Sequence, residues 1–144
     1  MILELLRRRR SVRAFEERPV PDEVLVEMLE AGRLSPSGGN EQPYRFGVVT
    51  DPESIAMIAE AAYRQTWIAD APLLIVLCVK VVPEEAEGGP FQEFRFPQFH
   101  QAMRLMPPGL FVALNQEEHQ TKIPGAYMAL VALEHGIGST WRDA

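Results

Sequence analysis

The sequence predicts a single globular domain, residues 1–144, that contains both helices and strands. A chain of 144 residues suits one ordinary domain. Hydrophobic residues make up 47% of it and charged residues 24%, a mixture typical of globular proteins rather than of disordered or collagen-like chains. Stretches with the apolar spacing of helices alternate with β-rich runs, which indicates a mixed α and β fold.

The charge balance argues against two classes of partner. Twenty acidic residues against 14 basic ones give a net charge of −6, which disfavours bulk binding to nucleic acid or to an anionic membrane. No run of apolar residues is long enough to span a bilayer. The arginines at 7–10 follow the apolar N-terminal residues, the reverse of a secretory signal. Because Cys78 is the single cysteine, no intramolecular disulfide forms, and we expect a cytoplasmic protein.

The first third of the chain predicts two helices and a loop. Residues 1–8 predict a short helix that docks by one apolar face, and residues 9–15, which lack a helical period, predict an extended segment. Pro21 and the two acidic residues after it open a second helix, which ends at Gly32 or runs on to Leu34. Serine, proline and glycine then predict a loop.

The rest of the chain predicts two strands and two further helices. Residues 44–50 form a β-rich run, and Asp51 caps the helix that follows. Residues 73–82 are almost continuously apolar, which predicts a strand buried on both faces. A helix that is apolar nearly all round begins at Pro124 and ends at Gly136, so we expect it to be central.

The segment between the second strand and the last helix has a different composition. Residues 83–124 contain six prolines, with several phenylalanines between them. So many apolar side chains do not suit a free linker. We expect residues 83–123 to form a variable lid, arm or interface, with short helices near 99–106 and 110–120.

A basic cluster follows the first predicted helix. In an extended segment alternate side chains point the same way, so Arg9, Ser11 and Arg13 lie on one side. Two guanidiniums and a hydroxyl are suitable donors for one phosphate group. Two alternatives remain: Arg7 and Arg8 form a solvated helix end, or the whole cluster binds nucleic acid or another phosphate ligand, which the acidic chain disfavours.

The glycine-containing loop is a second candidate site. Gly38 and Gly39 allow the backbone to approach a flat ligand closely. Ser37, Asn40 and Gln42 offer donors and acceptors to the edge of such a ligand. The loop lacks the Gly-Lys-Ser/Thr of a P-loop. The alternative is a plain connection between a helix and a strand.

Other reactive side chains do not form a recognisable catalytic or metal site. The histidines, His100, His119 and His135, have no partners at metal-ligand spacing, so no metal is predicted. We expect Cys78 to be buried and inert within its apolar strand. The sequence contains no nucleophile elbow, and we predict no catalytic side chain.

Three motifs in order resemble those of the nitroreductase family of FMN-dependent oxidoreductases. They are the run from Arg9 to Phe15 (RRSVRAF), the run from Ser35 to Tyr44 (SPSGGNEQPY) and the run from Gly136 to Trp141 (GIGSTW). The resemblance implies an α+β fold with a central, mainly antiparallel sheet flanked by helices. It also implies an intertwined homodimer that holds FMN at the subunit interface.

The resemblance also assigns residues to the cofactor. Arg9, Ser11 and Arg13 would hold the phosphate and ribityl end of FMN, and Arg10 would contribute through its backbone. The loop of the partner subunit would contact FMN through Pro36, Ser37, Gly38, Asn40 and Gln42. The segment containing Ser139, Thr140 and Trp141, up to Arg142, would lie against the isoalloxazine ring.

The activity implied is a ping-pong transfer of electrons. NADH or NADPH would reduce FMN, and a nitroaromatic, quinone or similar small molecule would then accept the electrons. The flavin carries this chemistry, while the protein binds, orients and adjusts the electrostatics. Family members continue past the Gly-Ser-x-Trp segment with another strand and a late basic residue. The alternative is therefore a truncated or degenerate member that keeps the fold and dimerises without flavin.

Overall fold

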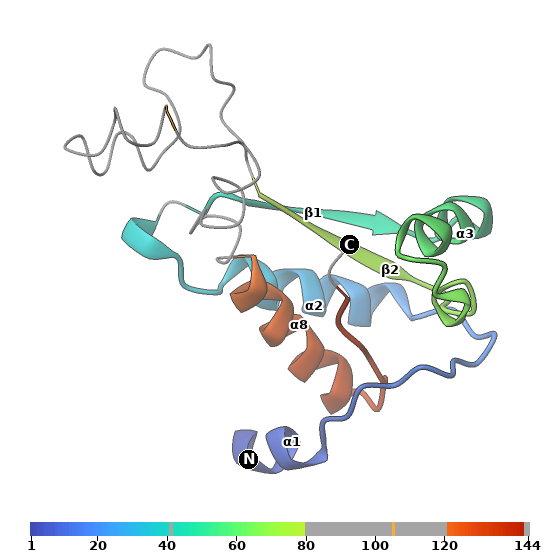
Figure 1. Ribbon diagram of the computed structural model, residues 1–144. Helices are drawn as coiled ribbons and strands as arrows, with labels where there is room; N and C mark the ends of the chain where they lie inside the picture. Colours follow the sequence, from blue (N-terminus) through green and yellow to red (C-terminus); the bar gives the residue numbers. More distant parts are fainter. Residues whose placement is uncertain (41, 80–104, 106–120, 143–144) are drawn as a thin grey trace.

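Two helices and a two-stranded sheet make up the centre of the molecule. The computed structural model describes residues 1–40, 42–79, 105 and 121–142. Strands β1 (Tyr44–Val49) and β2 (Leu74–Val79) pair antiparallel. Helices α2 (Asp22–Arg33) and α8 (Lys122–Glu134) lie side by side against one face of this sheet (Figure 1). The predictions for residues 83–123 lie almost wholly outside the described residues.

The main core lies between these helices and the sheet. Buried side chains from both helices pack together, with Phe46 of β1 and Leu77 of β2 against them; the buried set is Val24, Met28, Met128 and Ala132. Phe46 and Leu77 are opposite each other in the strand register, so they share one face. Burial of this face explains why the apolar spacing of both helices is visible in the sequence.

The sequence predicts that α2 ends either at Gly32 or at Leu34. The end at Gly32 is wrong, because the helix continues to Arg33. Gly32 is buried inside the helix instead. A Cβ at this position would collide with the side chain of Met128 and lie 3.1 Å from the Phe46 ring. The glycine therefore allows α2 to approach α8 and β1 closely.

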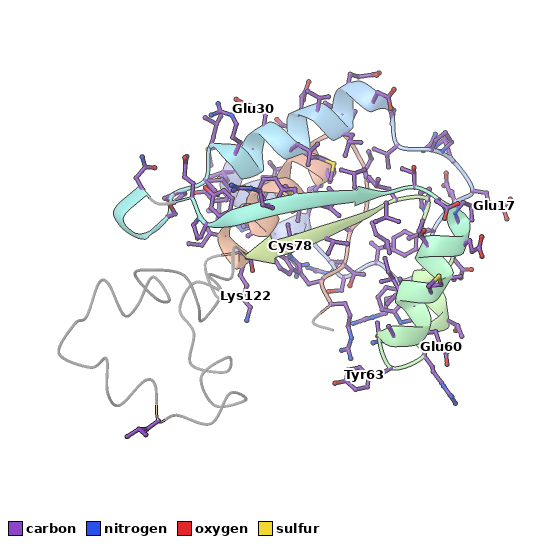
Figure 2. The ribbon with its side chains drawn as sticks, turned by 90° about the horizontal axis from the view of Figure 1, so that it is seen from above. Glu17, Glu30, Glu60, Tyr63, Cys78 and Lys122 are labelled. Atoms are coloured by element: carbon purple, nitrogen blue, oxygen red, sulfur yellow. The ribbon has the colours of Figure 1, made fainter. Side chains whose placement is uncertain are left out.

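Two predictions for the second strand are also wrong. The strand is not buried on both faces, and Cys78 is not buried. Cys78 is exposed and Val76 is 38% exposed, whereas Leu77 faces the helices. Side chains alternate along a strand, and none of the described helices covers the face that carries Cys78 (Figure 2). A continuous apolar run does not by itself distinguish a strand covered on one face from one covered on both.

The N-terminal helix α1 (Ile2–Arg8) is confirmed, but it docks weakly. Helix α1 contacts α8, and Leu5 is half-buried, while Ile2 and Leu6 remain 65% and 51% exposed. No residue of α1 is fully buried. Its apolar face is therefore largely uncovered in the part of the chain that the structure describes.

A smaller core forms at one end of the sheet. Helix α3 (Pro52–Ala61) begins as predicted, with the Asp51 carboxylate accepting a hydrogen bond of 2.8 Å from the Ser54 N–H. The 3₁₀ turn η2 (Thr66–Ile68) then leads to β2. Buried Ala59, Ala62 and Ile68 pack together, with Trp67 and Leu74 against them. This core fixes the turn between α3 and β2.

Helix α8 is central, as predicted, although it begins at Lys122 rather than Pro124. Pro124 is fully buried. After His135 the chain leaves the helix at Gly136, whose φ of 76° is readily adopted by glycine. Within the described ranges, no helix is long and apolar enough to cross a membrane.

Candidate cofactor site

Two of the three sequence motifs meet in the folded chain. Ser11 forms a parallel β-bridge with Ser139, and the N–H of Val12 donates a hydrogen bond of 3.0 Å to the carbonyl of Ser139. The segment that follows α1 thus lies beside the segment that follows α8 (Figure 1). We call residues 9–13 and 138–142 the paired segments. They join the predicted phosphate-binding residues to the predicted ring-binding residues.

Glycines allow the paired segments to pack closely. A Cβ at Gly138 would lie 2.7 Å from Cγ2 of Val12, which is closer than such atoms approach. On α8, a Cβ at Gly125 would lie 2.5 Å from Cδ1 of Leu77 and collide with the Trp141 ring. The second paired segment is therefore seated over α8 and β2, with Trp141 as its anchor.

The arginines of the first paired segment have different surroundings. Arg9 is half-buried. The Arg10 guanidinium donates hydrogen bonds to the carbonyls of Arg7 and Arg9, at 3.2 and 3.0 Å, so it satisfies the end of α1. The Arg13 guanidinium lies over the Trp67 ring, 5.8 Å from its centroid.

The second paired segment carries a buried polar atom without a partner. The Thr140 hydroxyl oxygen is buried and has no hydrogen-bond partner among the residues that the structure describes. Such a group is costly unless something binds it. Next to it, Trp141 and Arg142 line a shallow pocket of about 460 Å³ together with Lys122 and Ala126. The Arg142 guanidinium lies 5.4 Å from the centroid of the Tyr63 ring.

The third motif folds into a separate turn. Gly38–Asn40 form a 3₁₀ turn, η1, and the Asn40 N–H donates to the carbonyl of Ser37 at 3.0 Å. The Gln42 N–H donates to the Ser37 hydroxyl at 2.9 Å. Asn40 and Gln42 both have positive φ, 57° and 49°. Pro36 is exposed just before this turn. The loop therefore has a defined backbone conformation.

Buried hydrogen bonds fix the base of this loop. The Tyr44 hydroxyl donates to the carbonyl of Ser35 at 2.9 Å, and the Ser35 hydroxyl donates to the carbonyl of Gly32 at 2.7 Å. The loop lies at the end of the sheet where β1 begins, away from the paired segments (Figure 1). Within one chain the structure does not bring Ser37, Asn40 or Gln42 to the paired segments.

Two residues of this region, Tyr63 and Trp67, did not stand out in the sequence, and both contact arginines of the paired segments. Tyr63 and Trp67 lie on the turn between α3 and β2, and Arg142 is close to the end of the described chain. Spacing gives no signal for contacts between such distant positions. Among the described residues, no group of three His, Cys, Asp or Glu side chains gathers as a metal site would require.

Comparison with known proteins identifies the family. A sequence profile described as "Nitroreductase family" matches residues 6–144. The chain belongs to the nitroreductase family. It is 32% identical over 144 aligned positions to a protein of Thermus thermophilus named NADH dehydrogenase, covering 92% of this chain and 68% of that protein.

Two further comparisons are consistent with family membership. The chain is 34% identical to the FMN reductase [NAD(P)H] of Bacillus subtilis over 54% of its length and 31% of that protein. The FMN-dependent nitroreductase from Clostridium difficile R20291 has the same fold, with a TM-score of 0.68 and 22% identity over 98% of this chain and 65% of the other. The α+β fold is confirmed, and the family is one of oxidoreductases. The chain spans about two thirds of the length of the Thermus and Clostridium proteins.

Proposed function

We propose that this chain is an FMN-dependent oxidoreductase that transfers electrons from NADH or NADPH to a nitroaromatic, a quinone or a similar small acceptor. The observation that carries the proposal is the bridge between Ser11 and Ser139. Through this bridge a segment rich in arginine lies beside a segment with small polar side chains. The first suits the anionic tail of a ligand, and the second suits a polar ring.

The donors present suit the phosphate end of such a cofactor. Arg9 and Arg13 supply guanidiniums and Ser11 supplies a hydroxyl within five residues of chain. Ser11 and Arg13 are exposed, so both are open to a ligand. Charge-assisted hydrogen bonds from such groups are about twice as strong as neutral ones. These three residues would hold the phosphate.

The second paired segment suits the ring. The unpartnered Thr140 hydroxyl offers a hydrogen bond in a buried place, and Trp141 offers a flat apolar surface that is 38% exposed. Ser139, Thr140 and Trp141 would orient the ring and exclude water from one face. The bound flavin would supply the electron-transfer chemistry. No side chain of this chain is assigned a proton-transfer step.

A second copy of the chain is proposed to complete the site. The loop from Pro36 to Gln42 carries polar groups at a fixed position, but it lies away from the paired segments of its own chain (Figure 1). A homodimer in which each loop reaches the other subunit's paired segments would bring all three motifs to one ligand. Acidic charge and a single cysteine support a cytoplasmic location for this dimer.

The test is a spectrum and a melting curve of the purified protein with FMN. Binding to the folded state must raise the melting temperature, because the stabilisation grows with the logarithm of the ratio of free ligand to Kd. We expect yellow protein, a rise in Tm on adding FMN and oxidation of NADH or NADPH when a quinone is supplied. A stable dimer that stays colourless, with a Tm unchanged by FMN, would instead support the non-catalytic alternative.

A further inference from the structure

Tyr63 and Trp67 lie close together in sequence on the turn between α3 and β2, and we call this pair the aromatic corner. Trp67 is half-buried and packs on the small core around Ala62 and Ile68. Tyr63 is 75% exposed and extends from the end of α3 (Figure 2). A large exposed ring contributes little to folding, so its position calls for another explanation.

The aromatic corner contacts two arginines from two distant segments. The guanidinium carbon of Arg13 lies 5.8 Å from the centroid of the Trp67 ring, and that of Arg142 lies 5.4 Å from the centroid of the Tyr63 ring. The paired segments run parallel at their bridge. Both segments therefore continue in the same direction from the bridge. Each of them brings an arginine to the aromatic corner.

A cation–π contact does not use up the hydrogen-bond donors of an arginine. The ring attracts the positive charge, and the guanidinium N–H groups can still bind an anion. A carboxylate uses these N–H groups, as in the Arg33–Glu30 pair with hydrogen bonds of 2.7 and 2.6 Å. No carboxylate among the described residues lies within salt-bridge distance of Arg13 or Arg142. Each of the two cations thus has a ring contact but no carboxylate partner among the described residues.

The backbone of the corner is strained. Tyr63 and Arg64 both have a φ of 57°, a left-handed conformation that is unusual for large side chains. Arg64 forms a hydrogen bond of 2.9 Å with Glu60 on the preceding turn of helix. Tyr63 makes its ring contact with Arg142 instead. Strain of this kind tends to occur at functional sites.

We propose that Trp67 and Tyr63 are positioning residues that hold Arg13 and Arg142 ready to bind the anionic groups of the cofactor. This inference rests on the proposed function. Neither ring touches the anion itself. Each fixes a flexible cation beforehand, so that less conformational entropy is lost when the ligand binds.

The first test measures the Kd of FMN for Trp67→Leu and Trp67→Phe. Because a cation–π contact is modest in strength, we expect Trp67→Leu to raise Kd about three- to tenfold and Trp67→Phe to restore most of the affinity. A Kd for Trp67→Leu equal to that of the wild type would overturn the inference. Circular dichroism confirms that each variant is folded.

A double-mutant cycle separates positioning from packing. In an Arg13→Ala background, Trp67→Leu should change Kd less than about twofold, because the cation that the ring holds is already gone. If Trp67→Leu has the same effect with and without Arg13, the ring acts through the core and the inference is wrong.

Tyr63 provides a version of the test that does not disturb the core. Tyr63→Leu should leave Tm unchanged, because the ring is exposed, and should raise Kd about threefold through Arg142. Tyr127→Leu is the matched control, since Tyr127 is a partly exposed tyrosine on α8 for which no such effect is expected. Equal Kd values for these two variants would count against the inference.

A separate measurement distinguishes failure of this inference from failure of the proposed function. If the wild type binds no FMN, that function fails, and the inference is then judged with inorganic phosphate as the probe. NMR signals of the Arg13 and Arg142 side-chain N–H groups should shift on adding phosphate, and these shifts should weaken in Trp67→Leu and Tyr63→Leu. Absence of any shift in the wild type would overturn the inference as well.

Discussion

The paired segments and the loop from Pro36 to Gln42 carry parts of the same predicted cofactor site. The paired segments meet within one chain, whereas the loop lies apart from them. Ser11 and Ser139 are joined by a backbone bridge within one chain. The base of the loop is fixed by Tyr44 and Ser35, yet the loop lies at the end of the sheet where β1 begins, away from the paired segments (Figure 1). Because the loop does not reach the paired segments within the described residues, the proposed site needs the loop of a second copy.

The largest expected effect falls on the paired segments. Arg9→Ala combined with Arg13→Ala should raise the Kd of FMN at least about a hundredfold, because two charge-assisted contacts to phosphate are lost. Fluorescence titration with FMN measures this. Tm without ligand should hardly change. Flavin occupancy equal to that of the wild type would show that the phosphate binds elsewhere.

A smaller effect should follow from separating the two segments. Gly138→Ala places a Cβ 2.7 Å from Cγ2 of Val12, so we expect a loss of about 1–3 kcal/mol in the free energy of unfolding. Urea denaturation measures it. Val12→Ala should recover much of this loss in the double variant, because it removes the methyl groups in the way. If the two losses simply add, the segments are not in contact.

The loop can be tested by complementation between subunits. Asn40→Ala should raise the Kd of FMN about tenfold. Chains with Asn40→Ala are then mixed with chains carrying Arg9→Ala and Arg13→Ala, after brief unfolding and refolding. In a hybrid dimer one site receives both defects and the other receives none, so binding returns to about half of the hybrid sites. If no binding returns, each chain supplies its own loop.

The smallest effect concerns Asp51, far from either region. Hydrogen bonds from the side chain and backbone of Ser54 lower the pKa of this carboxylate. Asp51 therefore stabilises the fold above its ordinary pKa, and this contribution disappears as the pH falls through the lowered value. Asp51→Ala should lower Tm slightly at neutral pH and not at all in strong acid. A difference in Tm that does not depend on pH would contradict this.

Local features of the fold were readable from sequence because their causes are local. The cap at Asp51, the end of α8 at Gly136 and the apolar stripe of α2 depend on residues within a few positions of one another. The predicted helix end at Gly32 and the predicted burial of Cys78 are wrong, because both depend on residues that are distant in sequence. Gly32 faces Met128, and the exposure of Cys78 depends on which face of the sheet the helices cover.

The sequence by itself determined which hydrogen-bond donors the candidate cofactor site contains. Three short motifs in order resemble one family, and the residues of each motif are the candidate site residues. Only the tertiary structure decided which of them meet. It joined Ser11 to Ser139, kept the loop apart, and brought Tyr63 and Trp67 beside the arginines of the paired segments. The physical reason is that residue type and local spacing fix the chemistry of a side chain, whereas its neighbours across the fold depend on how helices and strands pack.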